Sequence, residues 1–278
     1  MNRPTTFLAH RIATQFSKAA EIYDKVAFVQ QEIGRRLLSR LTYMRLKPQY
    51  ILDIGAGTGT LTQALKAQFP SSTVVGLDLA FGMARTLQQK NISSVCADMH
   101  RLPFACSTFD LIVSNCTLQW STDPKQFFSA CQHALKPNGI LLLTTFGPDT
   151  LKELRMAFQQ ASNKPHVHDF MDMHDLGDCC LKLGFLDPVL DREDITVFYQ
   201  KLTTLLRDLK KLGASNQHPE RARGLMGKQT WQRMLDSYST LCQTSDKFPV
   251  TYEVLYCHAL KKPAHPDQSH IEITTCRL

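Results

Sequence analysis

Three closely spaced glycines follow a short apolar segment and could hold a ligand against the main chain. Gly55, Gly57 and Gly59 come directly after residues 50–54, and a glycine lets backbone atoms approach a ligand that a side chain would keep away. The dinucleotide pattern G-x-G-x-x-G would need its third glycine where Thr60 stands, and it would hold a pyrophosphate at a helix N-terminus. The spacing G-x-G-x-G therefore favours a ligand without phosphates.

Three aspartates stand at the ends of consecutive apolar segments near these glycines. Asp53 lies in the segment before the glycine turn, Asp78 ends the segment from 73, and Asp98 follows the segment 93–96. Asp78 comes about 20 residues after the glycines, where a carboxylate can accept hydrogen bonds from both hydroxyls of a ribose. The pairing of the glycine turn with Asp78 therefore predicts a site for a ligand that contains a ribose.

Alternating strands and helices are expected to position these residues. The order predicts an α/β, doubly wound, mostly parallel, Rossmann-like sheet of seven strands in one domain over 1–278, with helices on both faces. An N-terminal helical cap is expected over 1–45, and a helical, basic insertion over 200–248 between the sixth and seventh strands. The expected strands are 50–54, 73–77, 93–96, 109–114, 139–146, 188–198 and 250–260, and the expected helices include 19–41, 59–67, 81–89, 124–135, 149–161 and 174–183.

The glycine turn with its acids resembles the first motifs of the class I S-adenosylmethionine (SAM) methyltransferases. The resemblance implies SAM as the methyl donor. No metal is expected, because Cys179 and Cys180 and the nearby His166, His168 and His174 match no familiar zinc spacing. The resemblance also implies that the glycines approach the amino-acid part of SAM, that Asp78 binds the ribose, and that Asp98 contacts the adenine amine beside an apolar neighbour. The implied cofactor-binding residues are Asp53, Gly55, Gly57, Gly59, Asp78, Leu79, Asp98, Met99 and Asn115.

The residues at the end of the fourth expected strand indicate which kind of atom accepts the methyl group. Ser114-Asn115-Cys116-Thr117 is not the N/D-P-P-Y sequence with which many nucleic-acid and protein amine methyltransferases hold a planar nitrogen, so an oxygen or carbon acceptor is favoured. This region is similar to small-molecule carboxylate methyltransferases, in which Gln119 and Trp120 would line the substrate pocket.

Four further segments resemble the malonyl-acyl-carrier-protein O-methyltransferases of biotin synthesis, the BioC family. The resemblance covers nearly the whole chain and implies methylation of the free carboxylate of malonyl-acyl carrier protein, or of malonyl-CoA, early in pimeloyl synthesis. The segments begin with Phe16-Ser17-Lys18, Thr150-Leu151-Lys152, Phe170-Met171-Asp172 and Arg207-Asp208-Leu209.

A carboxylate acceptor explains why no general base stands out, because a carboxyl group with a pKa near ~4 is already ionised at neutral pH. An arginine is the expected clamp, since its planar fork matches a carboxylate. Arg155 is the first candidate, on a helix expected to begin near Asp149, and Arg155→Ala is expected to impair use of the malonyl substrate. Tyr23, on a helix that could cover SAM, and His174 are the other catalytic candidates.

Basic residues in the expected insertion suggest a protein partner. Acyl carrier proteins are acidic, and a basic surface beside the pocket could steer one into place. The patch lacks the interleaved aromatic residues and motifs of a nucleic-acid site. The candidate docking residues are Arg207, Lys210, Lys211, Arg221 and Arg223.

The composition excludes some classes of protein. The net charge is +7, and no apolar run approaches the length of a membrane span. The nine cysteines form no familiar metal or disulfide pattern, which favours reduced thiols in a cytoplasmic protein. Three alternatives stay open: a SAM-dependent assembly factor for a respiratory complex, a SAM-binding protein without catalysis, and a methyltransferase for a free, aconitate-type dicarboxylate.

Overall fold

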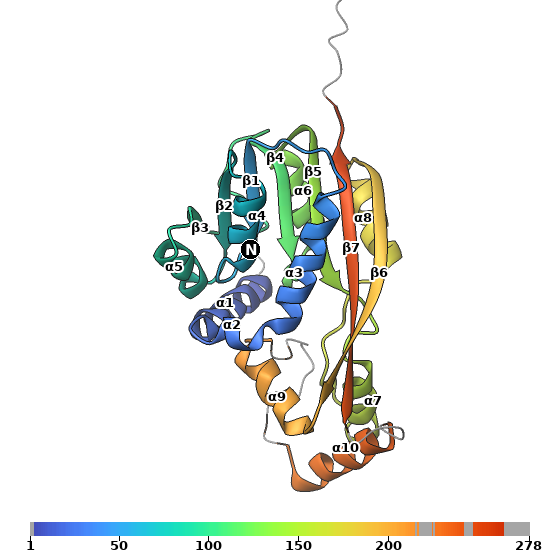
Figure 1. The fold of residues 1–278 in the computed structure, drawn as a ribbon. Helices are drawn as coiled ribbons and strands as arrows, with labels where there is room; N and C mark the ends of the chain where they lie inside the picture. Colours follow the sequence, from blue (N-terminus) through green and yellow to red (C-terminus); the bar gives the residue numbers. More distant parts are fainter. Residues whose placement is uncertain (1–2, 215, 217–223, 225, 242–246, 264–278) are drawn as a thin grey trace, which may run out of the picture.

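A seven-stranded sheet forms the centre of the structure, with the strand order β3-β2-β1-β4-β5-β7-β6 (Figure 1). The computed structural model describes residues 3–214, 216, 224, 226–241 and 247–263. β7 runs antiparallel to β5 and β6, whereas the other pairs are parallel. The chain order reverses beside β1, and the carboxyl ends of strands at such a reversal are the usual ligand site of an open α/β sheet. The predicted fold class is confirmed.

The strands agree with the predicted ones in number and order, and the last three are longer than predicted. Their bounds are β1 Tyr50–Ile54, β2 Thr73–Asp78, β3 Ser94–Cys96, β4 Phe109–Asn115, β5 Leu135–Phe146, β6 Phe185–Tyr199 and β7 Phe248–Lys261.

The helices cover both faces of the sheet, and the N-terminal helices lie beside it. One predicted helix, 19–41, is instead divided among α1, α2 and α3, and α1 begins near the start of the chain. No helix in the described ranges is long and apolar enough to span a membrane. The bounds are α1 Arg3–Ala19, α2 Tyr23–Val26, α3 Phe28–Leu41, α4 Thr60–Gln68, α5 Phe81–Gln89, η1 Leu118–Trp120, α6 Pro124–Ala134, α7 Lys152–Ala161, α8 Met173–Lys182, α9 Leu202–Lys211 and α10 Lys228–Leu241.

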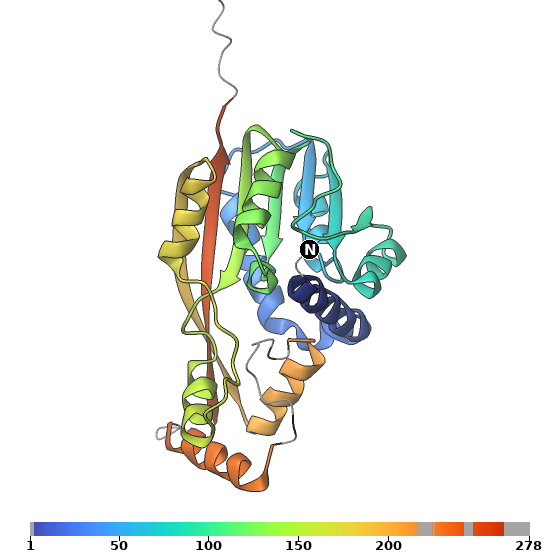
Figure 2. The same ribbon diagram turned by 180° about the vertical axis from the view of Figure 1, so that it is seen from behind.

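Two hydrophobic clusters hold the layers together, one on each face of the sheet. Successive strand residues point to opposite faces, so Ile51 packs with α3 and α4, whereas Leu52 packs with α6 and α8. Figures 1 and 2 show α3 in front of the sheet and α6 and α8 behind it. These layers fix the strand ends at which the predicted site residues lie.

β6 and β7 extend beyond the end of β5 as a two-stranded ribbon. The pairing of β5 with β7 ends at Phe146 and Val254, while that of β6 with β7 continues to Tyr199 and Phe248. In Figures 1 and 2, α7, α9 and α10 gather around this ribbon below the sheet. The ribbon thus places a helical extension next to the ligand-binding edge of the sheet.

Candidate active site

Three adjoining cavities lie at the carboxyl ends of the parallel strands. The first lies among the glycine turn, the ends of β2 to β4 and α1. The second lies among η1, α7, α9 and β7, and the third between α2–α3 and the start of α4. Gln119, Trp120 and Phe146 line both the first and the second cavity, so these two adjoin directly.

The first cavity joins the glycine turn to Asp78. One carboxylate oxygen of Asp78 accepts a hydrogen bond from the Gly57 amide at 2.9 Å, and the other accepts one from the Ala80 amide at 2.8 Å. Each oxygen keeps a further acceptor position. Withdrawal from solvent raises the pKa of Asp78 to about 6, although both backbone hydrogen bonds oppose the shift. An ionised Asp78 can therefore accept two hydroxyl hydrogen bonds from a ligand.

The three glycines of the turn have different roles. Gly57 has φ +56°, and a Cβ added there would meet only Tyr23 Cε1 at 3.8 Å, so its main chain faces open space. At Gly59, with φ +90°, a Cβ would lie 2.5 Å from Leu87. Gly59 lies outside the described linings of all three cavities, whereas Gly55 lines the first and third. Close approach to a ligand is therefore available at Gly55 and Gly57, while Gly59 allows helix packing.

Asp53 lies below the turn, in the third cavity's lining. Its side chain is almost fully buried, and Oδ2 accepts a hydrogen bond from the Thr62 hydroxyl at 2.6 Å. Oδ1 is enclosed without a hydrogen-bond partner. Burial raises the pKa of Asp53 to about 7. A ligand cation at the glycine turn would favour the ionised form.

Asp98 is oriented by a histidine that the sequence reasoning missed. Its Oδ1 is 2.9 Å from the His100 amide nitrogen and 2.7 Å from His100 Nδ1, and His100 Nε2 is 2.8 Å from the Ser121 hydroxyl. The hydrogen bond from His100 lowers the pKa of Asp98. Oδ2 makes no hydrogen bond within the described chain and can accept one from an amine. Leu79 and Met99 add apolar surface to the same cavity.

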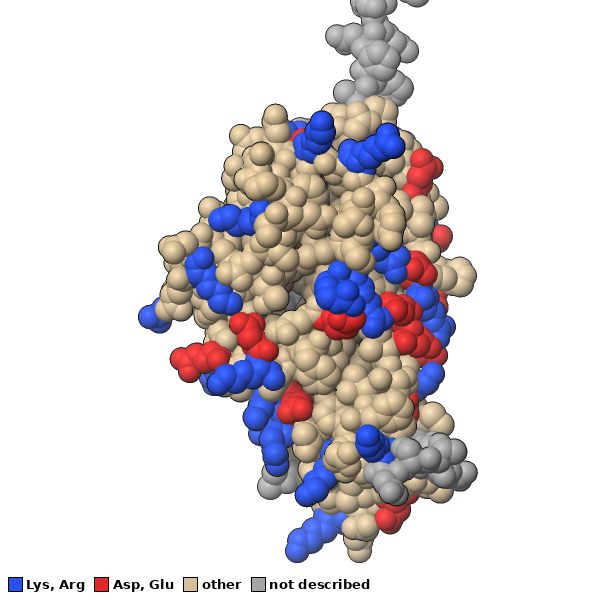
Figure 3. Space-filling model, viewed as in Figure 1, with Lys and Arg blue, Asp and Glu red and all other residues tan. Residues whose placement is uncertain are grey.

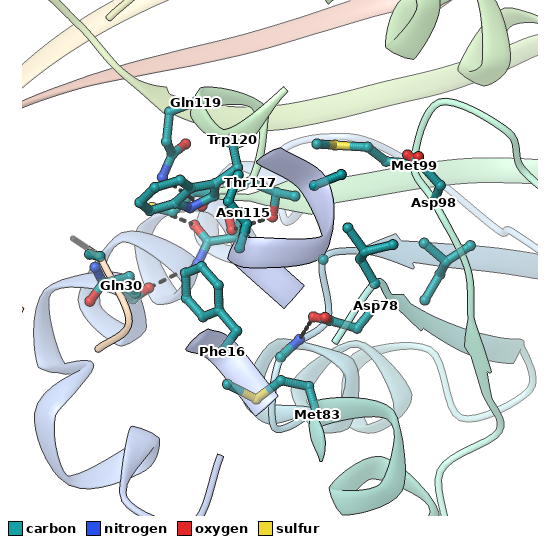
Figure 4. A pocket seen from close by; sticks show the side chains of 18 of the residues that line it. Phe16, Gln30, Asp78, Met83, Asp98, Met99, Asn115, Thr117, Gln119 and Trp120 are labelled. Carbon is teal, nitrogen blue, oxygen red and sulfur yellow. Dashed lines mark hydrogen bonds between the residues drawn. The ribbon is translucent and has the colours of Figure 1, made fainter. Parts of the chain in front are cut away.

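Asn115 fastens the end of β4 to its neighbours. Its Nδ2 donates to the Gln30 carbonyl at 2.9 Å, and its Oδ1 accepts from the Thr144 hydroxyl at 2.7 Å. Figure 4 shows Asp78, Asp98 and Met99 on one side of the pocket and Gln30, Gln119 and Trp120 on the other. Asn115 and Phe16 lie between these two groups. Asn115 thus lines the cavity while holding α3 against the sheet.

The second cavity is larger than the first, about 360 Å³ against about 120 Å³, and its walls are mostly apolar. A chain of ring contacts leads into it, from Phe16 to Trp120 at 5.4 Å between centroids and from Trp120 to His168 at 5.9 Å. Two leucines of α9, Leu206 and Leu209, line the opposite side. This cavity suits a slender, mainly apolar chain that reaches toward the first cavity.

The three predicted catalytic residues lie in different places. Tyr23 lines the first cavity, and burial, followed by nearby Cys116, Asp78 and Asp24, raises the pKa of its hydroxyl. His174 lies at the start of α8, where its side chain is 89% exposed and its ring pairs with Asp172. His174 contributes to none of the three described linings. Only Tyr23 of the three reaches the cavities.

The Arg155 side chain is engaged by backbone carbonyls. The helix begins at Lys152, after Leu151 in the left-handed conformation, and not at Asp149 as predicted. The guanidinium donates to the Pro148 carbonyl at 2.5 Å and to the Thr150 and His168 carbonyls at 3.4 and 3.3 Å. It is absent from the described linings. This geometry favours a role in joining two loops over the expected role as a carboxylate clamp.

Basic side chains lie on one face of α9. Arg207, Lys210 and Lys211 are exposed, and the spacings of three and four residues place them on neighbouring positions of the helix surface. Lys210 also lines the second cavity, which therefore reaches the surface beside this face. On the side shown in Figure 3, Lys and Arg side chains lie over the α9 region. Arg221 and Arg223 lie outside the described residues.

Several lining residues were missed because they come from distant segments. Phe16 and Gln30 line the first cavity and come from α1 and α3, whereas His100 stands only two positions after Asp98. His166 and His168 both line the second cavity. Within the described ranges, no group of three or more His, Cys, Asp or Glu side chains is placed to bind a metal ion.

Comparison with known proteins agrees with this geometry. The family model described as "Methyltransferase domain" matches residues 52–143. A putative methyltransferase structure from Bacillus halodurans has a TM-score of 0.58 at 16% identity, covering 81% of this chain and 98% of that one. A phosphoethanolamine N-methyltransferase 2 from Haemonchus contortus, solved with S-adenosylhomocysteine, has a TM-score of 0.51 at 17% identity, covering 83% of this chain and 53% of that one. These likenesses establish the fold.

Closer relatives establish the family. A Legionella pneumophila protein named malonyl-[acyl-carrier protein] O-methyltransferase is 40% identical over 268 residues, which cover 95% of this chain and 94% of that protein. A Coxiella burnetii protein named malonyl-[acyl-carrier protein] O-methyltransferase 1 is 44% identical over 241 residues, covering 87% and 84%. The chain therefore belongs to the malonyl-[acyl-carrier protein] O-methyltransferase family of class I SAM-dependent methyltransferases.

Proposed function

We propose that this enzyme transfers the methyl group of SAM to the free carboxylate of a malonyl group carried on acyl carrier protein. The observation that carries the proposal is the direct connection between two unlike cavities. The first has acids suited to a nucleoside, and the second is an apolar passage that reaches the surface beside α9. The names of the relatives supply the acceptor.

The residues of the first cavity fit an adenosine-containing ligand. Asp78 would accept both ribose hydroxyls, and the free Oδ2 of Asp98 would accept the adenine amine. Leu79 and Met99 would pack against the base, and the Gly57 main chain leaves space for the amino-acid part. When bound, SAM supplies a methyl group on a sulfonium, which is open to attack by a nucleophile opposite the sulfur.

The acceptor side requires orientation more than proton transfer. The malonyl carboxylate has a pKa near ~4 and is ionised at neutral pH, so no side chain must remove a proton. The raised pKa of Tyr23 keeps its hydroxyl protonated at neutral pH, which makes it a hydrogen-bond donor. The ring contacts of Phe16 and Trp120 exclude water where the two cavities meet, and orientation of this kind can supply a large part of a rate enhancement.

The position of α9 supports a carrier protein as the partner. Arg207, Lys210 and Lys211 present positive charge at the surface end of the second cavity. An acidic carrier docked there would direct its phosphopantetheine arm along the apolar passage. Charges at the edge of an interface act mainly on the association rate, so the surface would favour carrier-bound malonyl over malonyl-CoA.

Methyl transfer from labelled SAM tests the proposal, with malonyl-acyl carrier protein, malonyl-CoA and free malonate as parallel acceptors. The product is identified by mass. We expect a malonyl methyl ester formed fastest on the carrier protein. A protein that binds S-adenosylhomocysteine but forms no ester on any of the three would contradict the proposal, and the assembly-factor alternative would then be tested.

A further inference from the structure

The tripeptide Asp-Met-His occurs twice in the chain, at residues 98–100 and 172–174. In the first copy, Asp98 Oδ1 accepts from the His100 amide at 2.9 Å and lies 2.7 Å from His100 Nδ1. In the second copy, Asp172 Oδ1 accepts from the His174 amide at 2.7 Å and lies 2.9 Å from His174 Nδ1. Because an aspartate readily pairs with the backbone two residues on, the tripeptide forms this pairing by itself. Any special role of one copy must come from its surroundings.

The surroundings of the two copies differ. The His174 side chain is 89% exposed at the start of α8, whereas that of His100 is 10% exposed and lines the first cavity. His100 Nε2 lies 2.8 Å from the Ser121 hydroxyl, which also accepts a hydrogen bond from the Asp123 amide at 3.2 Å. Asp123 is the N-cap of α6. The first copy is thus joined to the start of α6 through Ser121.

The order of these hydrogen bonds fixes which groups donate. The Ser121 oxygen accepts from an amide, so its own O–H is available to donate to His100 Nε2. A neutral imidazole that accepts at one nitrogen carries its proton on the other, so Nδ1 donates to Asp98 Oδ1. Oδ2 of Asp98 makes no hydrogen bond within the described chain, and Figure 4 shows this side chain at the pocket beside Met99. His100 thus occupies one carboxylate oxygen and leaves the other to accept from a ligand.

A carboxylate held in this way can distinguish two kinds of purine. An ionised carboxylate has no proton to donate, so it accepts from the amine of a 6-aminopurine and repels the carbonyl oxygen of a 6-oxopurine. A protonated carboxyl would instead be able to donate to that carbonyl. The hydrogen bond from His100 lowers the pKa of Asp98, which favours the ionised form. The choice of base therefore depends on the orientation and the charge of Asp98, and His100 acts on both.

We propose that His100 is a positioning residue that gives the first cavity its preference for a 6-aminopurine over a 6-oxopurine, by holding Asp98 from Ser121. The inference rests on the proposed function, because it places the base of SAM beside Asp98. It adds His100 and Ser121 as residues that determine donor specificity. Neither belongs to the described lining of the second cavity, so their effect belongs to donor binding and not to the acceptor.

Two ligands measure this preference directly, S-adenosylhomocysteine and S-inosylhomocysteine, in which a carbonyl replaces the adenine amine. Calorimetry gives the Kd of each, and the ratio of the two values reports the preference. A hydrogen bond to a charged group predicts that the wild type binds S-adenosylhomocysteine roughly 10-fold to 100-fold more tightly. His100→Ala should reduce this ratio about 3-fold to 10-fold, because Asp98 then keeps only the hydrogen bond from the backbone.

Three further variants separate the contacts. His100→Asn keeps a side-chain N–H near the position of Nδ1 and should recover part of the ratio that His100→Ala loses. Ser121→Ala removes only the distant partner and should reduce the ratio less than His100→Ala. His174→Ala is the matched control, because it removes the same local pairing from the exposed copy of the tripeptide, and its ratio should equal that of the wild type.

Activity measurements separate recognition of the base from a general structural role. In His100→Ala, the KM for SAM should rise about 3-fold to 10-fold. With saturating SAM and malonyl-acyl carrier protein, kcat should stay within about twofold of the wild type. The Kd of S-inosylhomocysteine should weaken less than about twofold, which also shows that the variant is folded. Ser121→Ala carries the same test should His100→Ala not fold.

Three results would overturn the inference. The first is a wild type that binds both ligands equally. The second is an unchanged ratio in folded His100→Ala. The third is equal weakening of both ligands in His100→Ala and Ser121→Ala, which would leave His100 with a structural role alone. A wild-type enzyme that shows the preference but forms no malonyl methyl ester would instead refute the proposed function and leave the inference in place.

Discussion

The first and second cavities are built in opposite ways. The first takes its acids from strand ends, where Asp78 ends β2 and Asp98 follows β3. The second gathers side chains from η1, β5, α7, α9, β7 and the loop between α7 and α8. Both linings are mostly apolar, but the first cavity carries acids fixed by the sheet, whereas the second is fixed by packing among helices. The difference suggests that donor binding and acceptor choice can be changed separately.

Asp78→Leu should produce the largest effect and should be confined to the donor side. The change removes an acceptor for two ligand hydroxyls and leaves the Gly57 and Ala80 amides without their partner. Loss of hydrogen bonds to a charged group predicts about 3 kcal/mol, or roughly 100-fold in the Kd of S-adenosylhomocysteine. Calorimetry measures this Kd directly. An affinity within about twofold of wild type would mean that Asp78 does not bind the donor.

Leu209→Trp tests the acceptor side with a comparable effect. Leu209 lines the second cavity and no other described cavity, and a larger ring there would occupy the passage. Overfilling a packed site costs about 1–3 kcal/mol, which predicts a roughly 5-fold to 150-fold lower kcat/KM for malonyl-acyl carrier protein. The Kd of S-adenosylhomocysteine should remain that of wild type. Equal losses in both quantities would show that the two cavities are not independent.

Arg155→Ala distinguishes a structural role from the clamp expected from the sequence. The guanidinium joins the Pro148 and Thr150 carbonyls to the His168 carbonyl across two loops. Hydrogen bonds from a charged group predict a loss of about 2 kcal/mol in the free energy of unfolding, measured by denaturant titration. Arg155→Lys should restore only part of it, because a lysine lacks the fork. Unchanged stability with a raised KM for the malonyl substrate would support the clamp instead.

Many lining residues of the first cavity could be predicted because local sequence patterns indicate them. Asp78, Leu79, Asp98 and Met99 follow strands that apolar runs mark clearly, and all four line the first cavity. The spacing from the glycines to Asp78 depends only on one helix and one strand. The sheet was predicted for the same reason, since each strand is a short apolar segment bounded by turns.

The second cavity could not be predicted in this way because its contacts join distant segments. Gln119 and His168 are 49 positions apart, and their contact joins η1 to the loop between α7 and α8. The start of α7 was predicted too early, because Leu151 takes a left-handed conformation and the helix begins only at Lys152. Such a conformation is uncommon for leucine, and no local pattern indicates it.

Binding in the first cavity should depend on pH through Asp78. The pKa of Asp78 is raised to about 6, so falling pH protonates this carboxyl and removes its capacity to accept ligand hydroxyls. The affinity for S-adenosylhomocysteine should therefore fall by up to about tenfold per unit, or about 1.4 kcal/mol, as the pH drops from about 7 to about 5.

The stability of the ligand-free protein should respond to Asp78 in the opposite direction. A folded pKa above the unfolded one means that the folded state binds the proton more tightly. The stability that this tighter proton binding contributes is complete below about pH 4 and is lost as the pH rises through about 6.

Asp78→Asn tests whether Asp78 causes the pH dependence of donor binding. In this variant, calorimetry should show that the affinity for S-adenosylhomocysteine changes less with pH than in the wild type. An Asp78→Asn profile as steep as that of wild type would assign the titration to another group, with Asp53 the next candidate because its pKa is raised to about 7.

Charge reversal on α9 should have the smallest effect and should depend most on the carrier. Lys211→Glu changes an exposed position outside the described cavity linings, and a single surface charge contributes about 0.2–1 kcal/mol. Such a charge acts on encounter more than on chemistry, so kcat/KM for malonyl-acyl carrier protein should fall by up to about fivefold, and kcat should stay unchanged. The loss should shrink as salt is added, because screening weakens exposed charges. Malonyl-CoA is the matched acceptor without a carrier protein. An equal, salt-independent loss on both acceptors would mean that α9 shapes the second cavity and does not dock a partner.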